Sequence, residues 1–252
     1  MEKYVFFFDI DGTLYDPIDK VCESTKKAIE LLKKAGHICA ISTGRSFIGS
    51  KDIADELGIE YVVADGGNSV YSNGECVYAK SLDSTFCREL IAYAKENGLT
   101  YVVMDNDKYY GETKLDEMEA THPWIEYGGS NDSDCKEIMK VGICVNEQCQ
   151  QEIIDGFECH FYVFKDYQFM VTDQDNKHLG ILKCKELMKY MGKHIVFGDS
   201  FNDLKMFEGA DFSVCMGQAH EDVKKCASYV TTPVRENGIY NACNELGYFE
   251  VE

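Results

Sequence analysis

Two aspartates, Asp9 and Asp11, follow directly on the first apolar segment of the chain. Carboxylates one residue apart repel each other, and the arrangement costs stability unless a cation neutralises it. Mg²⁺ is the natural candidate, because it is a hard ion that prefers carboxylate oxygens and retained waters. Gly12 would permit the sharp turn that exposes the pair. A single aspartate here would be an ordinary cap or turn residue, so it is the pair that predicts metal chemistry.

Groups suited to an anion occur at two further places. Ser42, Thr43, Gly44 and Arg45 follow a second apolar segment, where a hydroxyl and successive backbone N–H groups at a helix entrance could cradle a phosphate. Serine or threonine before a helix is also ordinary capping. Lys177 stands near the start of a predicted helix, where a cation opposes the helix dipole and needs another reason to be present. An exposed lysine is the ordinary alternative.

A fourth cluster, with Gly198, Asp199, Asn202 and Asp203, comes after another apolar segment. Helix capping explains one acid of this cluster but not both acids and the glycine. Taken together, the four clusters supply carboxylates for Mg²⁺, a carboxylate nucleophile, a hydroxyl donor and a lysine. In-line phosphoryl transfer requires these groups, because its charge is spread over equatorial oxygens.

The elements that must position these clusters alternate between strand and helix. Apolar, β-prone runs at 4–8, 37–42 and 60–64 are separated by helical spacing at 21–35 and 46–57. This order predicts an α/β fold with a doubly wound, mostly parallel, Rossmann-like sheet. Three of the four clusters stand at or just beyond the carboxyl ends of predicted strands, where open α/β sheets place their ligand crevice.

The pattern changes after a hairpin predicted at Asn73-Gly74, and residues 81–175 form an α+β unit of their own. We expect two domains, a catalytic core of residues 1–80 and 176–252 and an inserted cap of residues 81–175. Within the cap, helices are predicted around 86–94 and 149–157, strands at 99–104, 138–145, 159–164 and 168–172, and an irregular stretch between 104 and 138. Beyond the cap, a helix is predicted at 181–191 and strands at 194–197 and 212–215.

Composition limits the kinds of partner. The 252 residues are 45% hydrophobic, and no run of about eighteen apolar residues occurs, so we expect a cytoplasmic protein. None of the 12 cysteines is at C-x-x-C spacing, which favours reduced, mostly buried thiols, with Cys39, Cys144, Cys184 and Cys215 in apolar stretches. A net charge of −19 argues against nucleic acid and anionic membranes, but a small phosphorylated metabolite stays possible where a cation reverses the local potential. We expect a monomer or small homo-oligomer.

The ordered motifs resemble those of the haloacid dehalogenase superfamily. They read Asp9-x-Asp11-Gly12-Thr13, Thr43-Gly44-Arg45, Lys177 and Gly198-Asp199-x-x-Asn202-Asp203. More narrowly, the chain resembles the Cof-like phosphatases, whose large α/β cap is inserted between the second and third motifs. Met216-Gly217-Gln218-Ala219 and Glu236-Asn237-Gly238-Ile239 also resemble signatures of that subfamily. Two departures are Asp65 and Gln218, each of which replaces a common asparagine, and a third is His178-Leu179 after Lys177.

This resemblance implies roles for individual residues. Asp9 would be the nucleophile and a metal ligand, and Asp11 the general acid and base, also binding metal through its backbone carbonyl. Thr43 and Lys177 would hold the phosphoryl group, and Asp199 would bind Mg²⁺ directly. The remaining predicted site residues are Gly44, Arg45 and Asn202 for substrate and Asp203 for the metal, with Asn202 and Asp203 also orienting the metal shell and the lysine.

The function that follows is a Mg²⁺-dependent phosphatase acting on a small phosphomonoester, a sugar phosphate or a phosphorylated cofactor, through an aspartyl-phosphate on Asp9. A phosphomutase and a non-catalytic, phospho-ligand-binding regulatory protein are the alternatives. Specificity would lie in the cap between residues 111 and 136, which holds His122, Trp124 and Tyr127. These aromatic side chains could contact substrate or form the core of the cap.

Overall fold

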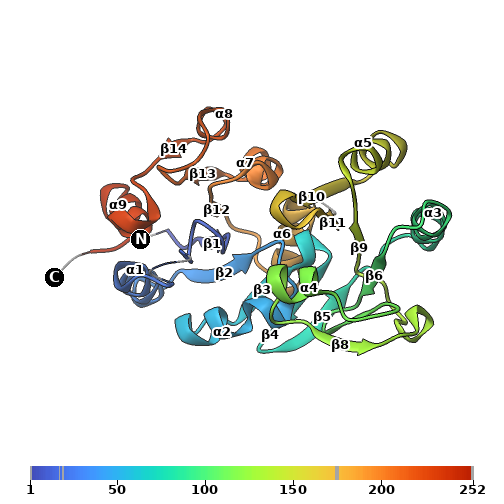
Figure 1. Cartoon of the computed structure of the whole chain (residues 1–252). Helices are drawn as coiled ribbons and strands as arrows, with labels where there is room; N and C mark the ends of the chain where they lie inside the picture. Colours follow the sequence, from blue (N-terminus) through green and yellow to red (C-terminus); the bar gives the residue numbers. More distant parts are fainter. Residues whose placement is uncertain (1, 17, 19, 174–175, 251–252) are drawn as a thin grey trace. The chain divides into compact units, whose positions relative to one another are not determined.

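The computed structural model describes residues 2–16, 18, 20–173 and 176–250. The chain divides into two compact units (Figure 1). The core unit comprises Met1–Gly44, Ser50–Tyr78 and Asp175–Glu252, and the insert unit comprises Arg45–Gly49 and Ala79–Gln174. Residues 45–49 therefore group with the insert unit, although the sequence analysis assigned them to the core. Asp175, the expected last residue of the cap, lies outside the described residues.

The core unit is built on one sheet with the strand order β14-β13-β12-β1-β2-β3-β4-β5. All neighbours from β14 to β3 pair in parallel, and β4 pairs antiparallel to β3. The four residues of β1 are all buried, as expected for a parallel strand covered on both faces. The predicted α/β, mostly parallel fold is confirmed. The strands are β1 (Val5–Phe8), β2 (Ile38–Ser42), β3 (Tyr61–Ala64), β4 (Ser69–Ser72), β5 (Glu75–Ala79), β12 (His194–Gly198), β13 (Phe212–Cys215) and β14 (Tyr229–Val230).

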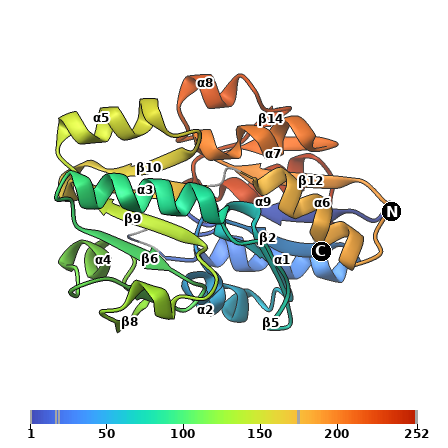
Figure 2. The same cartoon turned by 90° about the vertical axis from the view of Figure 1, so that its right-hand side faces the viewer.

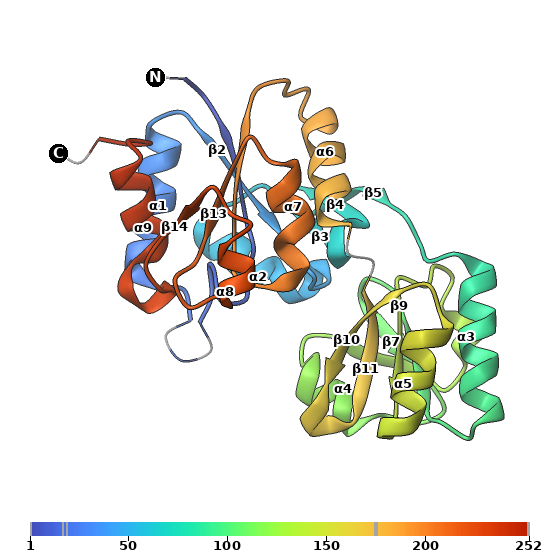
Figure 3. The same cartoon turned by 90° about the horizontal axis from the view of Figure 1, so that it is seen from above.

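Helices cover both faces of the core sheet. Figure 3 shows α1 and α9 on one side of the strands and α6 and α7 on the other. Ile181 and Cys184 of α6 are buried in one cluster with Phe7 and Val196 of the sheet, whereas α1 buries Ile29 and its neighbours. The helices are α1 (Glu23–Lys34), α2 (Phe47–Leu57), α6 (Lys177–Leu187), α7 (Leu204–Gly209), α8 (Glu221–Lys224) and α9 (Gly238–Glu245).

The hairpin between β4 and β5 forms at the predicted dipeptide. Asn73 and Gly74 have φ angles of 51° and 82°, both in the left-handed region. Two consecutive residues of this kind make the turn whose twist matches that of the flanking strands, and Asn-Gly is the dipeptide that tolerates it best. The prediction of a hairpin at this place is therefore confirmed.

The insert unit has a sheet of its own, in the order β10-β11-β9-β6-β7-β8. Figures 2 and 3 show α3 and α5 side by side, and both helices bury side chains in one cluster with the sheet. Met118 of α4 belongs to a second cluster, with Val102 and Phe169. The elements are α3 (Ser84–Glu96), β6 (Tyr101–Met104), β7 (Lys108–Tyr110), α4 (Asp116–Thr121), β8 (Glu126–Gly129), β9 (Lys140–Cys144), α5 (Glu147–Gly156), β10 (His160–Phe164) and β11 (Phe169–Asp173).

The expectation of an irregular stretch between residues 104 and 138 is wrong. The stretch contains β7, α4 and β8, which have three, six and four residues. Only Met118 is buried in α4, and β8 has the sequence Glu-Tyr-Gly-Gly, so neither segment shows an apolar period. Segments this short carry too few buried side chains for a periodic pattern to reveal them.

His122, Trp124 and Tyr127 of this stretch pack within the insert unit. The ring of His122 is buried, with its centroid 5.8 Å from that of Trp124 and 5.5 Å from that of Phe164. Burial lowers the pKa of His122 to about 3, so its imidazole is neutral. Trp124 and Tyr127 pack, partly buried, against the cluster that contains Met118. These contacts favour the cap-core alternative over a substrate platform for His122.

All twelve cysteines are free thiols; Cys39, Cys184 and Cys215 are buried, and Cys144 is half-buried. Burial raises the pKa of the Cys39 thiol to about 12, which keeps it protonated and inert.

Across the described part of the chain, every helix is too short or too polar to traverse a lipid bilayer.

One glycine allows α6 to approach the sheet closely. A Cβ added at Gly180 would lie 2.5 Å from Val63 Cγ1 and 2.6 Å from the Cα of Gly67, in the short 3₁₀ helix η1 (Asp65–Gly67). We expect Gly180→Ala to lower the free energy of unfolding by about 1–2 kcal/mol, because overpacking outweighs the better helix propensity of alanine. Urea unfolding measures the change. Gly156→Ala at the end of α5, where a Cβ would meet nothing within 4 Å, is the control; equal stability of the two variants would contradict the packing argument.

Candidate active site

The register of the central strands brings the first, second and fourth sequence clusters to one edge of the core sheet. Phe8 of β1 lies opposite Ile41 of β2 and opposite Phe197 of β12. The backbone N–H of Asp9 donates to the Phe197 carbonyl at 2.9 Å. Because the three strands are parallel, Asp9, Thr43 and Asp199 all follow their carboxyl ends.

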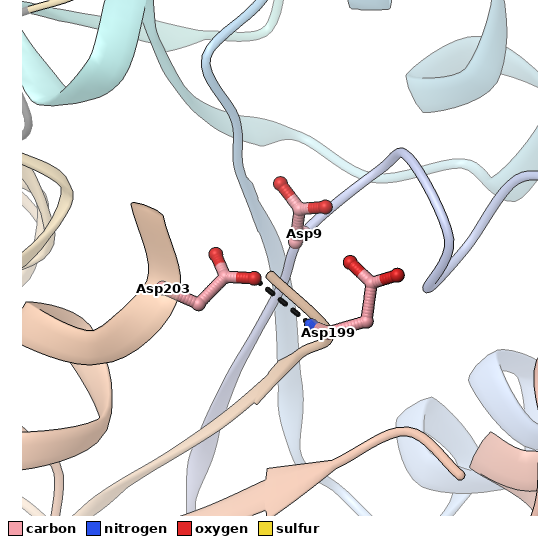
Figure 4. A group of neighbouring side chains, drawn as sticks. All are labelled: Asp9, Asp199 and Asp203. Carbon is pink, nitrogen blue, oxygen red and sulfur yellow. Dashed lines mark hydrogen bonds between the residues drawn. The ribbon is translucent and has the colours of Figure 1, made fainter. Parts of the chain in front are cut away.

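Three carboxylates gather at this edge. Each of Asp9, Asp199 and Asp203 offers an oxygen, and these oxygens lie within 4.8 Å of one another (Figure 4). Asp9 and Asp203 are buried, and Asp199 is half-buried. The arrangement concentrates negative charge in a poorly solvated place, which requires a compensating cation.

Lys177 supplies part of that compensation. Its Nζ lies 2.7 Å from Asp9 Oδ1, 2.7 Å from Asp203 Oδ1 and 3.3 Å from Asn202 Oδ1. The lysine is 1% exposed, although it is the first residue of α6. The alternative of an ordinary exposed lysine is therefore wrong. The third cluster joins the other three through this side chain.

Burial and charge shift the ionisation of the group. Burial raises the pKa of Asp9 well above its ordinary value, since the Lys177 ammonium only partly offsets the loss of hydration. Burial likewise raises the pKa of Asp199 to about 6, and the neighbouring Asp203 carboxylate adds to this effect. Burial works to lower the pKa of Lys177, but Asp203 and Asp9 more than compensate and raise it. One ammonium is thus too little positive charge for the surrounding carboxylates.

Asp203 is held by hydrogen bonds at both of its oxygens. Its Oδ2 accepts from the backbone N–H of Asp199 at 2.9 Å (Figure 4) and from that of Ser200 at 3.0 Å. Its Oδ1 accepts from Lys177 Nζ at 2.7 Å. Ser200 caps the 3₁₀ helix η4 (Phe201–Asp203) in a capping box with this aspartate. The Ser200 hydroxyl also donates to Asn202 Oδ1 at 2.7 Å. Through these bonds Asp203 fixes the Lys177 ammonium and the Asp199 backbone, and Asn202 contacts the same ammonium.

Asp11 lies at the exposed side of the cluster. Its negative charge adds to the rise in the pKa of Asp9 and of Asp199, but it contributes less than burial and less than the Asp203 carboxylate. The turn that carries it depends on Gly12, which has a φ of 78°. A Cβ at this position would also run into the carboxylate of Asp199. Glycine is therefore required both by the turn and by the close approach of Asp199.

The second sequence cluster continues from β2 into the start of α2. Thr43 is buried; its backbone N–H donates to the Val63 carbonyl at 2.9 Å, and its own carbonyl accepts from the N–H of Gly66 at 3.0 Å. Gly44 and Arg45 are half-buried. Arg45 Nη1 donates to the Gly49 carbonyl at 3.0 Å, which fixes the guanidinium against the first turn of α2.

Comparison with known proteins identifies the family of the chain. A sequence model described as haloacid dehalogenase-like hydrolase matches residues 6–243. The chain belongs to this family. It is 32% identical to a protein of Bacillus subtilis named "Putative phosphatase YkrA", over 98% of this chain and 99% of that one. It is also 23% identical to 5-amino-6-(5-phospho-D-ribitylamino)uracil phosphatase YcsE of the same organism, over 93% and 92% of the two chains.

Solved structures share the fold of this chain. A crystal structure of a hypothetical protein from Geobacillus kaustophilus has a TM-score of 0.86 at 28% identity, covering 98% of this chain and all of that one. A sugar phosphatase called BT4131, of subclass IIB of the superfamily, has a TM-score of 0.81 at 23% identity, with 98% of this chain and 100% of that chain covered, and so supports the fold alone. The resemblance to Cof-like phosphatases is confirmed.

The carboxylates of this hydrolase fit a divalent cation. Asp199 Oδ1 is buried and has no hydrogen-bond partner among the described residues. A buried carboxylate oxygen without a partner is costly, and a metal ion would satisfy it. Oxygen ligands of this kind suit Mg²⁺, which takes one or two carboxylates together with waters and substrate phosphate oxygens.

Two departures from the family pattern now have structural explanations. Asp65 adopts a φ of 52°, is 2% exposed and accepts a hydrogen bond from the Ser69 hydroxyl at 2.7 Å, so it stabilises the turn after β3 from inside the protein. Gln218 contacts both Gly12 and Asp199. The sequence analysis gave Gln218 no role, because the spacing of its motif does not reveal which strand end it reaches.

Proposed function

We propose that this hydrolase is a Mg²⁺-dependent phosphatase that cleaves small phosphomonoesters through an aspartyl-phosphate on Asp9. The observation that carries the proposal is Lys177, which is buried and forms ion pairs with both Asp9 and Asp203, so that the Asp9 carboxylate is held in place. Its bond engages Oδ1 of Asp9, and among the described residues nothing hydrogen-bonds Oδ2. An oxygen of this oriented carboxylate is then available to attack phosphorus.

Asp11 supplies the proton transfers in this scheme. As an exposed carboxyl group two residues after Asp9, it would protonate the leaving alkoxide while the phosphorus–oxygen bond to Asp9 forms. It would then take a proton from the water that cleaves the aspartyl-phosphate. Thr43 and Lys177 would hold the phosphoryl oxygens. Gly44 and Arg45 would bind the substrate. One difficult displacement becomes two easier ones.

The divalent cation would be held by Asp9 and Asp199, and by the backbone carbonyl of Asp11. When bound, Mg²⁺ supplies positive charge to the oxygens of the transferring phosphoryl group. Asp203 would act on the metal site indirectly, because both of its oxygens already accept hydrogen bonds from the protein. Its bonds fix the backbone of Asp199 and the ammonium of Lys177.

We infer a sugar phosphate or a phosphorylated cofactor as substrate. A relative supports this class, since it is named for a phosphorylated ribitylaminouracil. The net charge of −19 disfavours nucleic acid and anionic membranes as partners. Twelve free thiols favour a reducing compartment such as the cytoplasm, and we propose a monomer or small homo-oligomer.

A screen of phosphorylated metabolites tests the proposal. We expect phosphate release from at least one small phosphomonoester in the presence of Mg²⁺, a fall of more than about 10³-fold with EDTA, and recovery when excess Mg²⁺ is added. The measurement is free phosphate, with product analysis by mass spectrometry. Release that is unaffected by EDTA would reject the metal requirement. A bisphosphate in place of free phosphate would indicate a mutase, and no turnover of any compound would favour a non-catalytic protein.

A further inference from the structure

Gln218 ties together three separate segments of the core unit. It follows β13 and is exposed to solvent. Its Nε2 donates to the Gly12 carbonyl at 2.5 Å and to Asp199 Oδ2 at 3.2 Å, and its Oε1 accepts from the backbone N–H of Val234 at 3.0 Å. One side-chain amide therefore joins the loop after β1, the end of β12 and the segment before α9.

The partners fix which way the amide faces. The Gly12 carbonyl and the Asp199 carboxylate can only accept hydrogen bonds, and the Val234 N–H can only donate. A flipped amide would place its oxygen against two other oxygens and its NH₂ group against another donor. The orientation in the structure satisfies all three contacts, so Gln218 presents both amide hydrogens to the site.

These hydrogen bonds affect the orientation of the Asp199 carboxylate. Gln218 engages Oδ2, while Oδ1 is buried without a partner among the described residues. Gly12 limits movement on another side, because its backbone lies so close that a Cβ there would overlap the Asp199 carboxylate. The two oxygens of the Asp199 carboxylate therefore differ: Oδ2 accepts a hydrogen bond from a neutral amide, and Oδ1 has no hydrogen-bond partner among the described residues.

We infer that Gln218 is a positioning residue that holds the Asp199 carboxylate with Oδ1 presented to the divalent cation. The inference rests on the proposed function, because it concerns the metal of that site. An amide suits the task, since it pairs with one oxygen without cancelling the negative charge that attracts the ion. A lysine or arginine in its place would compete with the cation for the same carboxylate.

Gln218→Met tests the inference, because methionine has a similar length but neither donates nor accepts a strong hydrogen bond. We expect its dissociation constant for Mg²⁺, measured by isothermal titration calorimetry, to rise about tenfold or more. In phosphate release, the Mg²⁺ concentration for half-maximal rate should rise by the same factor, while kcat at saturating Mg²⁺ changes less than about threefold. Gln218→Ala, which introduces no new contact, is the second variant and should behave in the same way.

Arg235→Met is the matched control. Arg235 Nη2 pairs with Asp16 Oδ1 at 2.9 Å, so it joins two of the same three segments, the loop after β1 and the segment before α9, and this ion pair does not involve Asp199. We expect its Mg²⁺ affinity to stay within about twofold of wild type. Thermal unfolding in EDTA checks that all variants are folded.

The outcomes separate the inference from the function it rests on. If Gln218→Met and Gln218→Ala bind Mg²⁺ as wild type does, or if Arg235→Met loses as much affinity as they do, Gln218 is only a tether between loops and the inference is overturned alone. If wild type itself binds no Mg²⁺ in the calorimeter, the inference and the metal part of the proposed function are overturned together.

Discussion

Asp9→Asn should reduce phosphate release by about 10⁴-fold or more without unfolding the protein. The amide cannot act as the nucleophile, yet it has nearly the same shape and its oxygen can still accept the hydrogen bond from Lys177 Nζ, which lies 2.7 Å from Asp9 Oδ1. The rate should be measured at saturating Mg²⁺ and substrate. Thermal unfolding should show a folded, cooperative protein.

A direct trap accompanies this rate measurement. Wild type quenched in acid during turnover should yield a peptide that contains Asp9 and carries one phosphoryl group, and the Asp9→Asn protein should yield none. Asp52→Asn, at an exposed position of α2, removes the same charge far from the cluster in sequence and should change the rate less than about twofold. Full activity in an Asp9→Asn preparation whose mass is verified would reject the assigned nucleophile.

Lys177→Met should have the largest effect on stability. The substitution leaves the carboxylates of Asp9 and Asp203 buried without their cation, and breaking a buried ion pair in this way costs about 3–5 kcal/mol. Phosphate release should also fall about 10²–10³-fold, because the proposed donor to the phosphoryl oxygens is lost. Urea unfolding in EDTA measures the stability without a contribution from metal.

The matched control for this substitution is Lys183→Met on the same helix. Lys183 is partly exposed and pairs with Glu186 at the surface, so the change should stay within about 0.5 kcal/mol. Adding Asp9→Asn to Lys177→Met should recover about 1 kcal/mol or more, because one uncompensated charge is removed. A Lys177→Met protein within 1 kcal/mol of wild type would show that the buried pairs contribute little to folding.

The core fold was predictable because its signals are local. The run Val-Phe-Phe-Phe of β1 is buried throughout, and Asn73-Gly74 forms the turn its dihedral preferences favour. The strand β14 was not predicted, since its two residues offer no pattern. The elements of the insert unit between residues 104 and 138 were missed for the same reason. Short segments that are stabilised by contacts with distant ones leave little trace in their own sequence.

The site was predictable in its composition and only partly in its geometry. Carboxylates at successive strand ends indicated the cluster, because parallel strands share an edge. Burial of Lys177 could not be foreseen from its place at a helix start. The pairing of Asp203 with the backbone of Asp199 depends on a capping box, which its spacing from Ser200 permits but does not require.

The strand order of the core sheet has a consequence for biosynthesis. β1 is made first, yet one of its two neighbours is β12, whose residues leave the ribosome only after the whole insert unit has been translated. Until then, the Phe-rich edge of β1 has unpaired backbone groups on that side. Nascent or truncated chains that end before residue 194 would therefore expose an unpaired strand edge that can hydrogen-bond to other chains. Such chains would depend on chaperones to avoid aggregation.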